Sequence, residues 1–91
     1  MASDIVRRIR GRQDGVIARW SGDELLLLDT VADRIHRLNS TAGRIWDKLE
    51  NGDPDEDIVQ ALCNEFDVSA DQARTDVAAT LREFREQGLI Q

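Results

Sequence analysis

The feature that most limits the fold is a series of short apolar runs separated by turn residues. "GVIARW" (15–20) and "ELLLLD" (24–29) flank the turn residues 21–23, and "RIHRL" (34–38) follows the turn "TVAD" (30–33). Runs of this length between turn residues are typical of strands joined by hairpins. The leucines of the second run would also suit a helix, but the distance between the two turns is too short for one. We therefore predict a three-stranded antiparallel meander.

The rest of the chain has helical periodicity, and the first of three helices is expected at about 41–51. Asn39 or Ser40 can serve as its N-cap, because either side chain accepts a hydrogen bond from a free backbone N–H. Gly52 follows as a terminating residue. The second helix is predicted to open with Asp53 as the N-cap and Pro54 at the first helical position.

The third helix has the clearest limits. Ser69 and Gln72 fit a capping box at its start, and Gly88 ends it, with Leu89 able to fold back on Phe84. The apolar positions that we expect to be buried in the three helices are Ile45, Trp46, Leu49, Ile58, Val59, Leu62, Phe66, Ala70, Ala73, Val77, Leu81 and Phe84. The predicted class is α+β, a winged helix-turn-helix-like arrangement of a three-stranded sheet followed by three helices.

Composition places this 91-residue chain among single-domain globular proteins. We predict a basic N-terminal arm at 1–14 and one domain at 15–91. No apolar run is long enough for a membrane helix, and the charged N-terminus does not suit a signal peptide. A lone Cys63 gives no disulfide framework, so we expect a cytoplasmic protein.

Candidate catalytic groups are scarce. The chain has one His, one Cys and no Tyr, so we predict no metal site, no cofactor and no catalytic residue. Asp55, Glu56 and Asp57 are interpreted as acids that complement the positive end of the second helix rather than as calcium ligands. Enzymatic activity is not expected.

Binding is the remaining class of function. The net charge of −6 and the acidic second helix argue against nucleic acid, although a DNA-binding winged helix remains an alternative. A sheet edge at Arg34–Leu38 would instead offer unpaired backbone groups to an added strand. That strand is either a peptide or, in a homodimeric interaction module, the same edge of a second copy. One flank of the third helix adds a shallow apolar surface between arginines, formed by Arg74, Ala78, Leu81 and Arg85.

These segments resemble the PqqD-like family, whose members recognise ribosomally made precursor peptides. The resemblance covers about residues 24–90. It rests on Leu38-Asn39, Ile45-Trp46, Leu49 with Gly52, Ile58-Val59 with Leu62, Val77 with Leu81, and Gly88-Leu89-Ile90. It implies a domain whose third strand and third helix hold the leader of a precursor. Carried over by position, the expected peptide-binding residues are Arg34, Ile35, His36, Arg37, Leu38, Arg74, Ala78, Leu81 and Arg85. Asn39 and Trp46 are expected to act as a cap and a core anchor.

The version "RLNSTAGRIW" is most similar to the free-standing leader-binding proteins of lasso-peptide biosynthesis. That resemblance implies an adaptor that delivers its precursor to a separate leader peptidase. The near alternative is the quinone-cofactor member, which presents a precursor to a radical SAM enzyme. A Pro-Glu-Gly-like turn is expected there between the second and third strands, where this chain has Thr30–Asp33.

Overall fold

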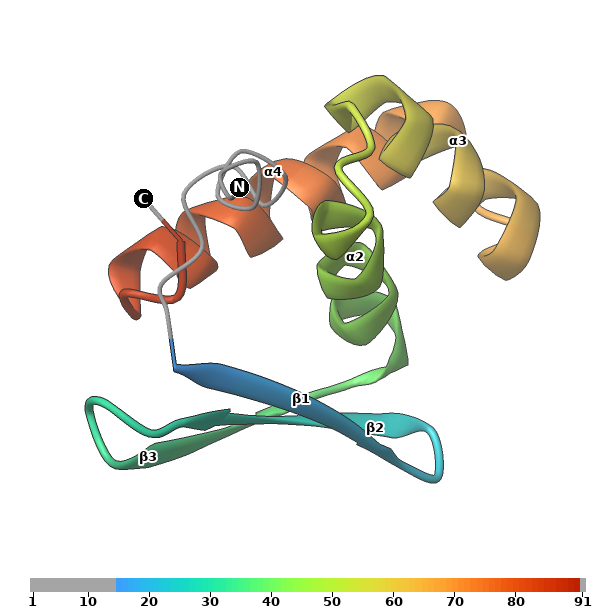
Figure 1. Ribbon diagram of the computed structural model, residues 1–91. Helices are drawn as coiled ribbons and strands as arrows, with labels where there is room; N and C mark the ends of the chain where they lie inside the picture. The colour runs from blue at the N-terminus through green and yellow to red at the C-terminus, as the bar shows by residue number, and fades with distance from the viewer. Residues whose placement is uncertain (1–14, 91) are drawn as a thin grey trace.

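In the computed structural model, which describes residues 15–90, three helices lie on one side of a three-stranded sheet (Figure 1). The strands are β1 (Val16–Ser21), β2 (Glu24–Asp29) and β3 (Arg34–Leu38). They pair antiparallel in the order β1-β2-β3, which confirms the meander, with β1 one residue later than expected. The proposed basic arm at 1–14 lies outside the described residues.

The β1–β2 turn fixes the register of the sheet. Ser21 pairs with Glu24 across a two-residue turn in which Gly22 has φ of +65°. Asp23 at the second turn position is not among the residues with positive φ, so the turn is of type II′ rather than type I′, and its twist matches that of the strands. Along β2, Leu25 and Leu27 consequently point to the helices and are fully buried, and Leu26 and Leu28 face the other way.

The helices are α2 (Ser40–Glu50), α3 (Asp55–Phe66) and α4 (Ala70–Glu86). Asn39 is the cap of α2, because its side-chain oxygen accepts the N–H of Ala42 at 2.9 Å. This decides between the two caps that the sequence allowed. The chain therefore passes from β3 into the helix at a single residue, which sets the start of α2 beside the end of β3.

The predicted start of α3 is wrong by one residue. Pro54 occupies the N-cap position with an extended backbone, and no side chain caps the helix. Asp53 is instead part of the end of α2, since its N–H donates to the carbonyl of Lys48 at 3.0 Å. Gly52 turns the chain there with φ of +82°.

Helix α4 begins and ends where the sequence indicates, although its capping box is incomplete. The hydroxyl of Ser69 accepts the N–H of Gln72 at 3.1 Å, as expected. The Gln72 amide does not return the bond and donates to Asp76 at 2.9 Å. Gly88 closes the helix with φ of +75°, and Leu89 is completely buried after it.

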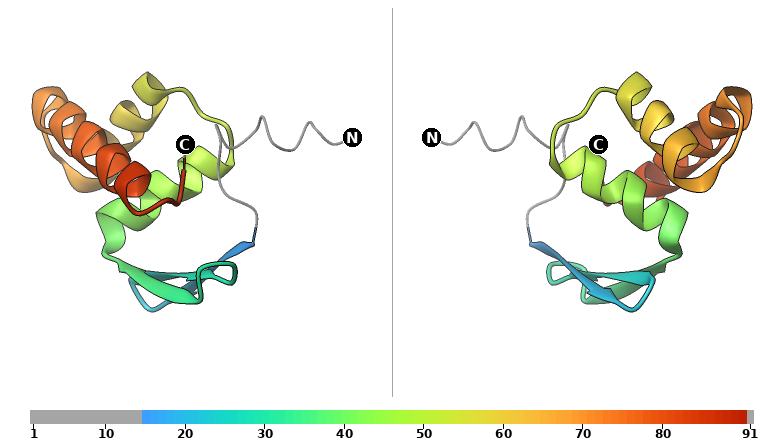
Figure 2. Two further views of the ribbon diagram at one scale, coloured as in Figure 1. Left: turned by 90° about the vertical axis from the view of Figure 1, so that its left-hand side faces the viewer. Right: turned by 90° about the vertical axis from the view of Figure 1, so that its right-hand side faces the viewer.

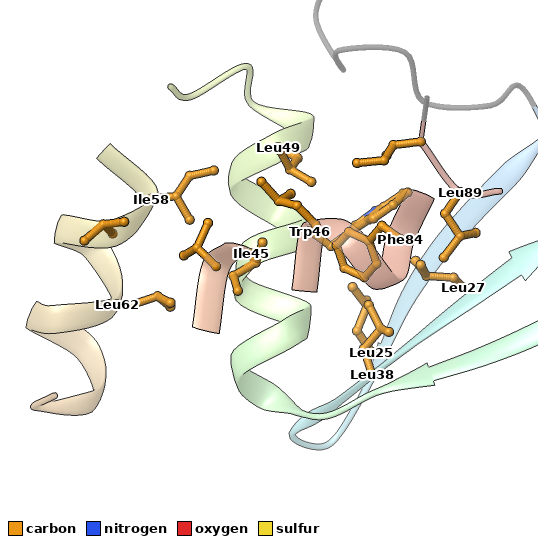
Figure 3. Packing of buried hydrophobic residues seen from close by; sticks show 14 of the residues in the cluster. Leu25, Leu27, Leu38, Ile45, Trp46, Leu49, Ile58, Leu62, Phe84 and Leu89 are labelled. Atoms are coloured by element: carbon orange, nitrogen blue, oxygen red, sulfur yellow. The ribbon is translucent and has the colours of Figure 1, made fainter. Parts of the chain in front are cut away.

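The core lies between the sheet and α2 and continues among the three helices, where Ile58 and Leu62 of α3 lie beside Ile45 of α2 (Figure 3). Trp46 is its largest fully buried side chain and meets Phe84 edge to face, with ring centroids 5.4 Å apart. The apolar helix positions predicted from the sequence are buried, except Phe66 and Ala70, which are half-buried. Two views at right angles to Figure 1 show the helices stacked on the same face of the sheet (Figure 2).

Close packing of α2 on β1 holds the helix over the sheet. A Cβ on Gly43 would lie 2.5 Å from the Trp20 ring, so only glycine leaves room for that indole. The indole N–H donates to Asp47 at 3.1 Å, and the Arg44 guanidinium lies 4.9 Å from the ring centroid. These contacts anchor the helix whose first turn borders the candidate site.

Candidate peptide-binding site

Strand β3 is an edge of the sheet, and its free backbone groups can be assigned from the register. The hairpin makes Ser21 and Glu24 a hydrogen-bonded pair, and such pairs alternate along antiparallel strands. The residues of β3 that bond to β2 are then every second one, His36 among them. By the same alternation, the N–H and C=O groups of Ile35 and Arg37 point away from the sheet. A peptide strand would bond to these two residues.

The side chains of β3 divide between the two faces of the sheet. His36 pairs with Leu27 and points inward, and its Nε2 is shielded from solvent without a hydrogen-bond partner among the described residues. Leu38 is buried in the core, and Arg34 is exposed. Ile35 lies on the outer face and is 67% exposed. The five predicted strand residues are thus contiguous, but they present different surfaces.

Arg37 already has an acidic partner on its own sheet. Its guanidinium donates to both carboxylate oxygens of Glu24, at 2.9 and 3.2 Å. The hydrogen bonds and the charge of Glu24 raise the pKa of Arg37 above its usual value. A leader carboxylate would have to compete with Glu24 for this arginine, so we assign Arg37 a backbone role.

A cleft of about 320 Å³ lies where β3 passes into α2, facing α4. The residues that line it are Asn39, Thr41, Ala42, Asp76, Ala79, Thr80 and Glu83. A second hollow is lined by the β1–β2 turn and Ser40, and Asn39 borders both. The end of the edge strand is therefore flanked by open surface into which peptide side chains can project.

The predicted flank of α4 is not the one that lines this cleft. Positions 74, 78, 81 and 85 lie on one side of the buried stripe of α4, and the cleft residues lie on the other. Arg74 bonds to Glu56 of α3 at 3.0 Å and is also near Asp71. Leu81 is only 5% exposed and belongs to the core, so it is not an open groove floor. Ala78 and Arg85 are exposed on that same side.

The sequence contains little indication of which residues of α4 would line a cleft. Asp76 and Glu83 read as solvated charges, and Ala79 and Thr80 as neutral helix positions. Their one distinguishing mark is the spacing 76, 79, 80 and 83, which places them on a single face of a helix. The sequence gives no way to choose that face over the opposite one, because both border the buried stripe.

No group of three or more His, Cys, Asp or Glu side chains among residues 15–90 is arranged to hold a metal ion. Cys63 is a free, half-buried thiol packed against the core. No described helix has the length and apolar character needed to cross a membrane.

Two solved structures are similar to this chain over almost its whole length. "TbiB1 in Complex with the TbiA(beta) Leader Peptide" is 30% identical with a TM-score of 0.81, covering 89% of this chain and 94% of that chain. "Lasso peptide synthetase B1 complexed with the leader peptide" is 26% identical with a TM-score of 0.80, covering 88% and 94%. No curated protein matches the chain. Residues 24–90 match the family model described as coenzyme PQQ synthesis protein D (PqqD), and the chain therefore belongs to the PqqD family.

Proposed function

We propose that this protein binds the leader of a ribosomally made precursor peptide by adding it as a fourth strand beside β3. The observation that carries the proposal is the position of a sheet edge, free among the described residues, next to the cleft between the start of α2 and α4. Support comes from the two similar structures, both of which were solved with leader peptides. Sheet addition of this kind obtains affinity from backbone bonds and specificity from pockets for alternate side chains.

Each part of the site has a distinct task in this proposal. Ile35 and Arg37 supply the backbone bonds that set the direction and register of the leader. The inward-facing leader side chains then meet His36 and the cleft lined by Ala79 and Thr80. The cleft begins at Asn39, directly after the last residue of β3, which favours β3 as the edge that binds.

The same comparisons support a proposal for the place of the protein in a pathway. We infer that it is a non-catalytic adaptor that delivers the leader to a lasso-type leader peptidase in the cytoplasm, where ribosomal precursors are made. The alternative within the family is a chaperone that presents a precursor to a radical SAM enzyme. The turn at Thr30–Asp33 has no proline or glycine, which favours the lasso-type role.

Fluorescence anisotropy tests the proposal with a labelled synthetic peptide of the leader encoded beside this chain's gene. The full chain is expected to bind it saturably at micromolar or lower concentration, and to bind neither a scrambled peptide nor a DNA duplex. A protein that binds the duplex and ignores the leader would establish the DNA-binding alternative. One that binds none of the three probes would refute the adaptor role.

The two flanks of α4 are distinguished by a matched pair of variants. Ala79 lines the cleft, and Ala78, its neighbour on the predicted flank, does not. Ala79→Arg is expected to weaken leader binding about tenfold by filling the cleft, whereas Ala78→Arg changes the same charge and leaves binding within about twofold. Both substitutions use a good helix former at an exposed site, so folding is preserved. If the two variants lose the same affinity, or Ala78→Arg loses more, the leader binds the flank of α4 predicted from the sequence.

A further inference from the structure

The outer face of the sheet carries an apolar row that no described helix covers. Ile17, Leu28 and Ile35 are cross-strand partners and so lie side by side on the face opposite the core. Ile17 is 49% exposed and Ile35 67%, and Leu28 is half-exposed between them. Figures 1 and 2 show α2, α3 and α4 all on the other side of the sheet. An apolar row of this kind on a small domain marks a surface for a partner.

A second row on this face is positively charged. Arg19, Leu26 and Arg37 are cross-strand partners there, next to the apolar row. Glu24 pairs with Arg37, which leaves Arg19 as the exposed cation at the β1 side. The face therefore suits a partner surface with an apolar centre and an acidic group at its rim.

The size of the face argues against a stable pair of identical chains. Three strands of five or six residues cover roughly 20 Å by 15 Å, or on the order of 300 Å². A stable interface takes about 800 Å² from each partner, so two such faces alone are too small. The occupant must therefore gain contacts from something besides the sheet of this protein.

The bound leader supplies that extra surface. A strand added to β3 extends the sheet by one strand, about 4.8 Å. Its side chains alternate, so every second leader residue would lie on the outer face beside Ile35. The outer face then becomes a composite of protein and leader, and it exists in full only when the leader is bound.

We propose that this composite outer face is the docking surface of the leader-processing enzyme, here the peptidase that cleaves the leader. The proposal rests on the proposed function, since it requires a leader strand at β3. It explains how an enzyme can distinguish a loaded adaptor from an empty one. The bound leader and the apolar row present one continuous surface, so enzyme and leader each strengthen the binding of the other.

Ile17 allows this surface to be tested apart from leader binding, because it lies on β1, two strands from the leader edge. Ile17→Glu places a charge in the apolar row, and Gln60→Glu on exposed α3 makes a control with one added negative charge. Ile17→Thr is a milder second variant that keeps a β-branched residue in the strand. Leader affinity is measured by anisotropy, and leader cleavage by the purified peptidase encoded in the same gene cluster is followed at increasing adaptor concentration.

Both Ile17 variants are expected to bind the leader within about twofold of the wild type, and to need at least about tenfold more adaptor for half-maximal cleavage. Gln60→Glu should match the wild type in both measurements. If the peptidase cleaves the leader with the same dependence on adaptor concentration for the Ile17 variants as for the wild type, the proposed docking surface is wrong. A wild-type dimer in sedimentation that Ile17→Glu dissociates would assign the face to a second copy instead. Failure of the wild-type protein to bind the leader would refute the proposed function itself. The anisotropy measurement detects this outcome independently of the cleavage measurement.

Discussion

Replacing Ile35 with proline is expected to abolish leader binding while leaving a folded domain. The N–H of Ile35 points away from β2 in the observed register, so proline removes a donor from the free edge and none from the sheet. The ring also occupies the space in which the added strand would lie. Loss of the bond and the obstruction together should weaken binding at least about 30-fold, the equivalent of ~2 kcal/mol. Anisotropy with the labelled leader measures the change.

Three variants control for the other effects of this substitution. Ile35→Val keeps the N–H and a branched side chain and should bind normally. Ala18→Pro removes an outward N–H from the opposite edge, β1, and should also leave binding unchanged. His36→Pro removes a donor that bonds to β2 and should destabilise the sheet. Normal leader binding by a folded Ile35→Pro protein would exclude strand addition at β3.

Replacing Trp46 with alanine is expected to have the largest effect on stability. Its side chain is fully buried and meets Phe84 edge to face at 5.4 Å. Truncating a buried tryptophan costs about 3–5 kcal/mol, and a domain of this size has roughly 5–10 kcal/mol in total. The variant should therefore unfold at much lower urea concentration, as followed by circular dichroism.

Trp46→Phe provides the matched control. It keeps an aromatic ring near Phe84, and it loses no hydrogen bond within the described residues, where the Trp46 indole N–H has no partner. A cost of about 1–3 kcal/mol is expected from the smaller volume. Near-equal losses for the two variants would mean that packing volume is not what Trp46 contributes. Leader binding should fall only in proportion to the unfolded fraction.

The order of strands and helices could be predicted from the sequence, because each element begins and ends at residues close to it in the chain. The limits of β2 follow from the turns on either side of it, and β3 lies between a turn and the cap of α2. Asn39 and Ser69 cap their helices through bonds within three residues. Predictions failed where two local choices competed. Asp53 joins the end of α2 instead of capping α3, and the side chain of Gln72 bonds Asp76 instead of completing its capping box.

The candidate site could be predicted only in part, since it depends on how distant elements meet. The edge strand follows from the order of the meander, which is local information. Which flank of α4 lines the cleft depends on the rotation of that helix over the core, and the local sequence pattern does not specify that rotation. Leu81 illustrates the difference: a charge placed there would test folding, because the side chain is buried in the core.

Hydrogen exchange at single amides tests strand addition at β3 most directly. In the free protein the N–H groups of Ile35 and Arg37 should exchange quickly, and that of His36 slowly, because only His36 bonds to β2. Adding the leader at saturating concentration should slow exchange at Ile35 and Arg37 and leave the outward amide of Ala18 on β1 unchanged. Saturable leader binding with no new protection at Ile35 or Arg37 would contradict the account.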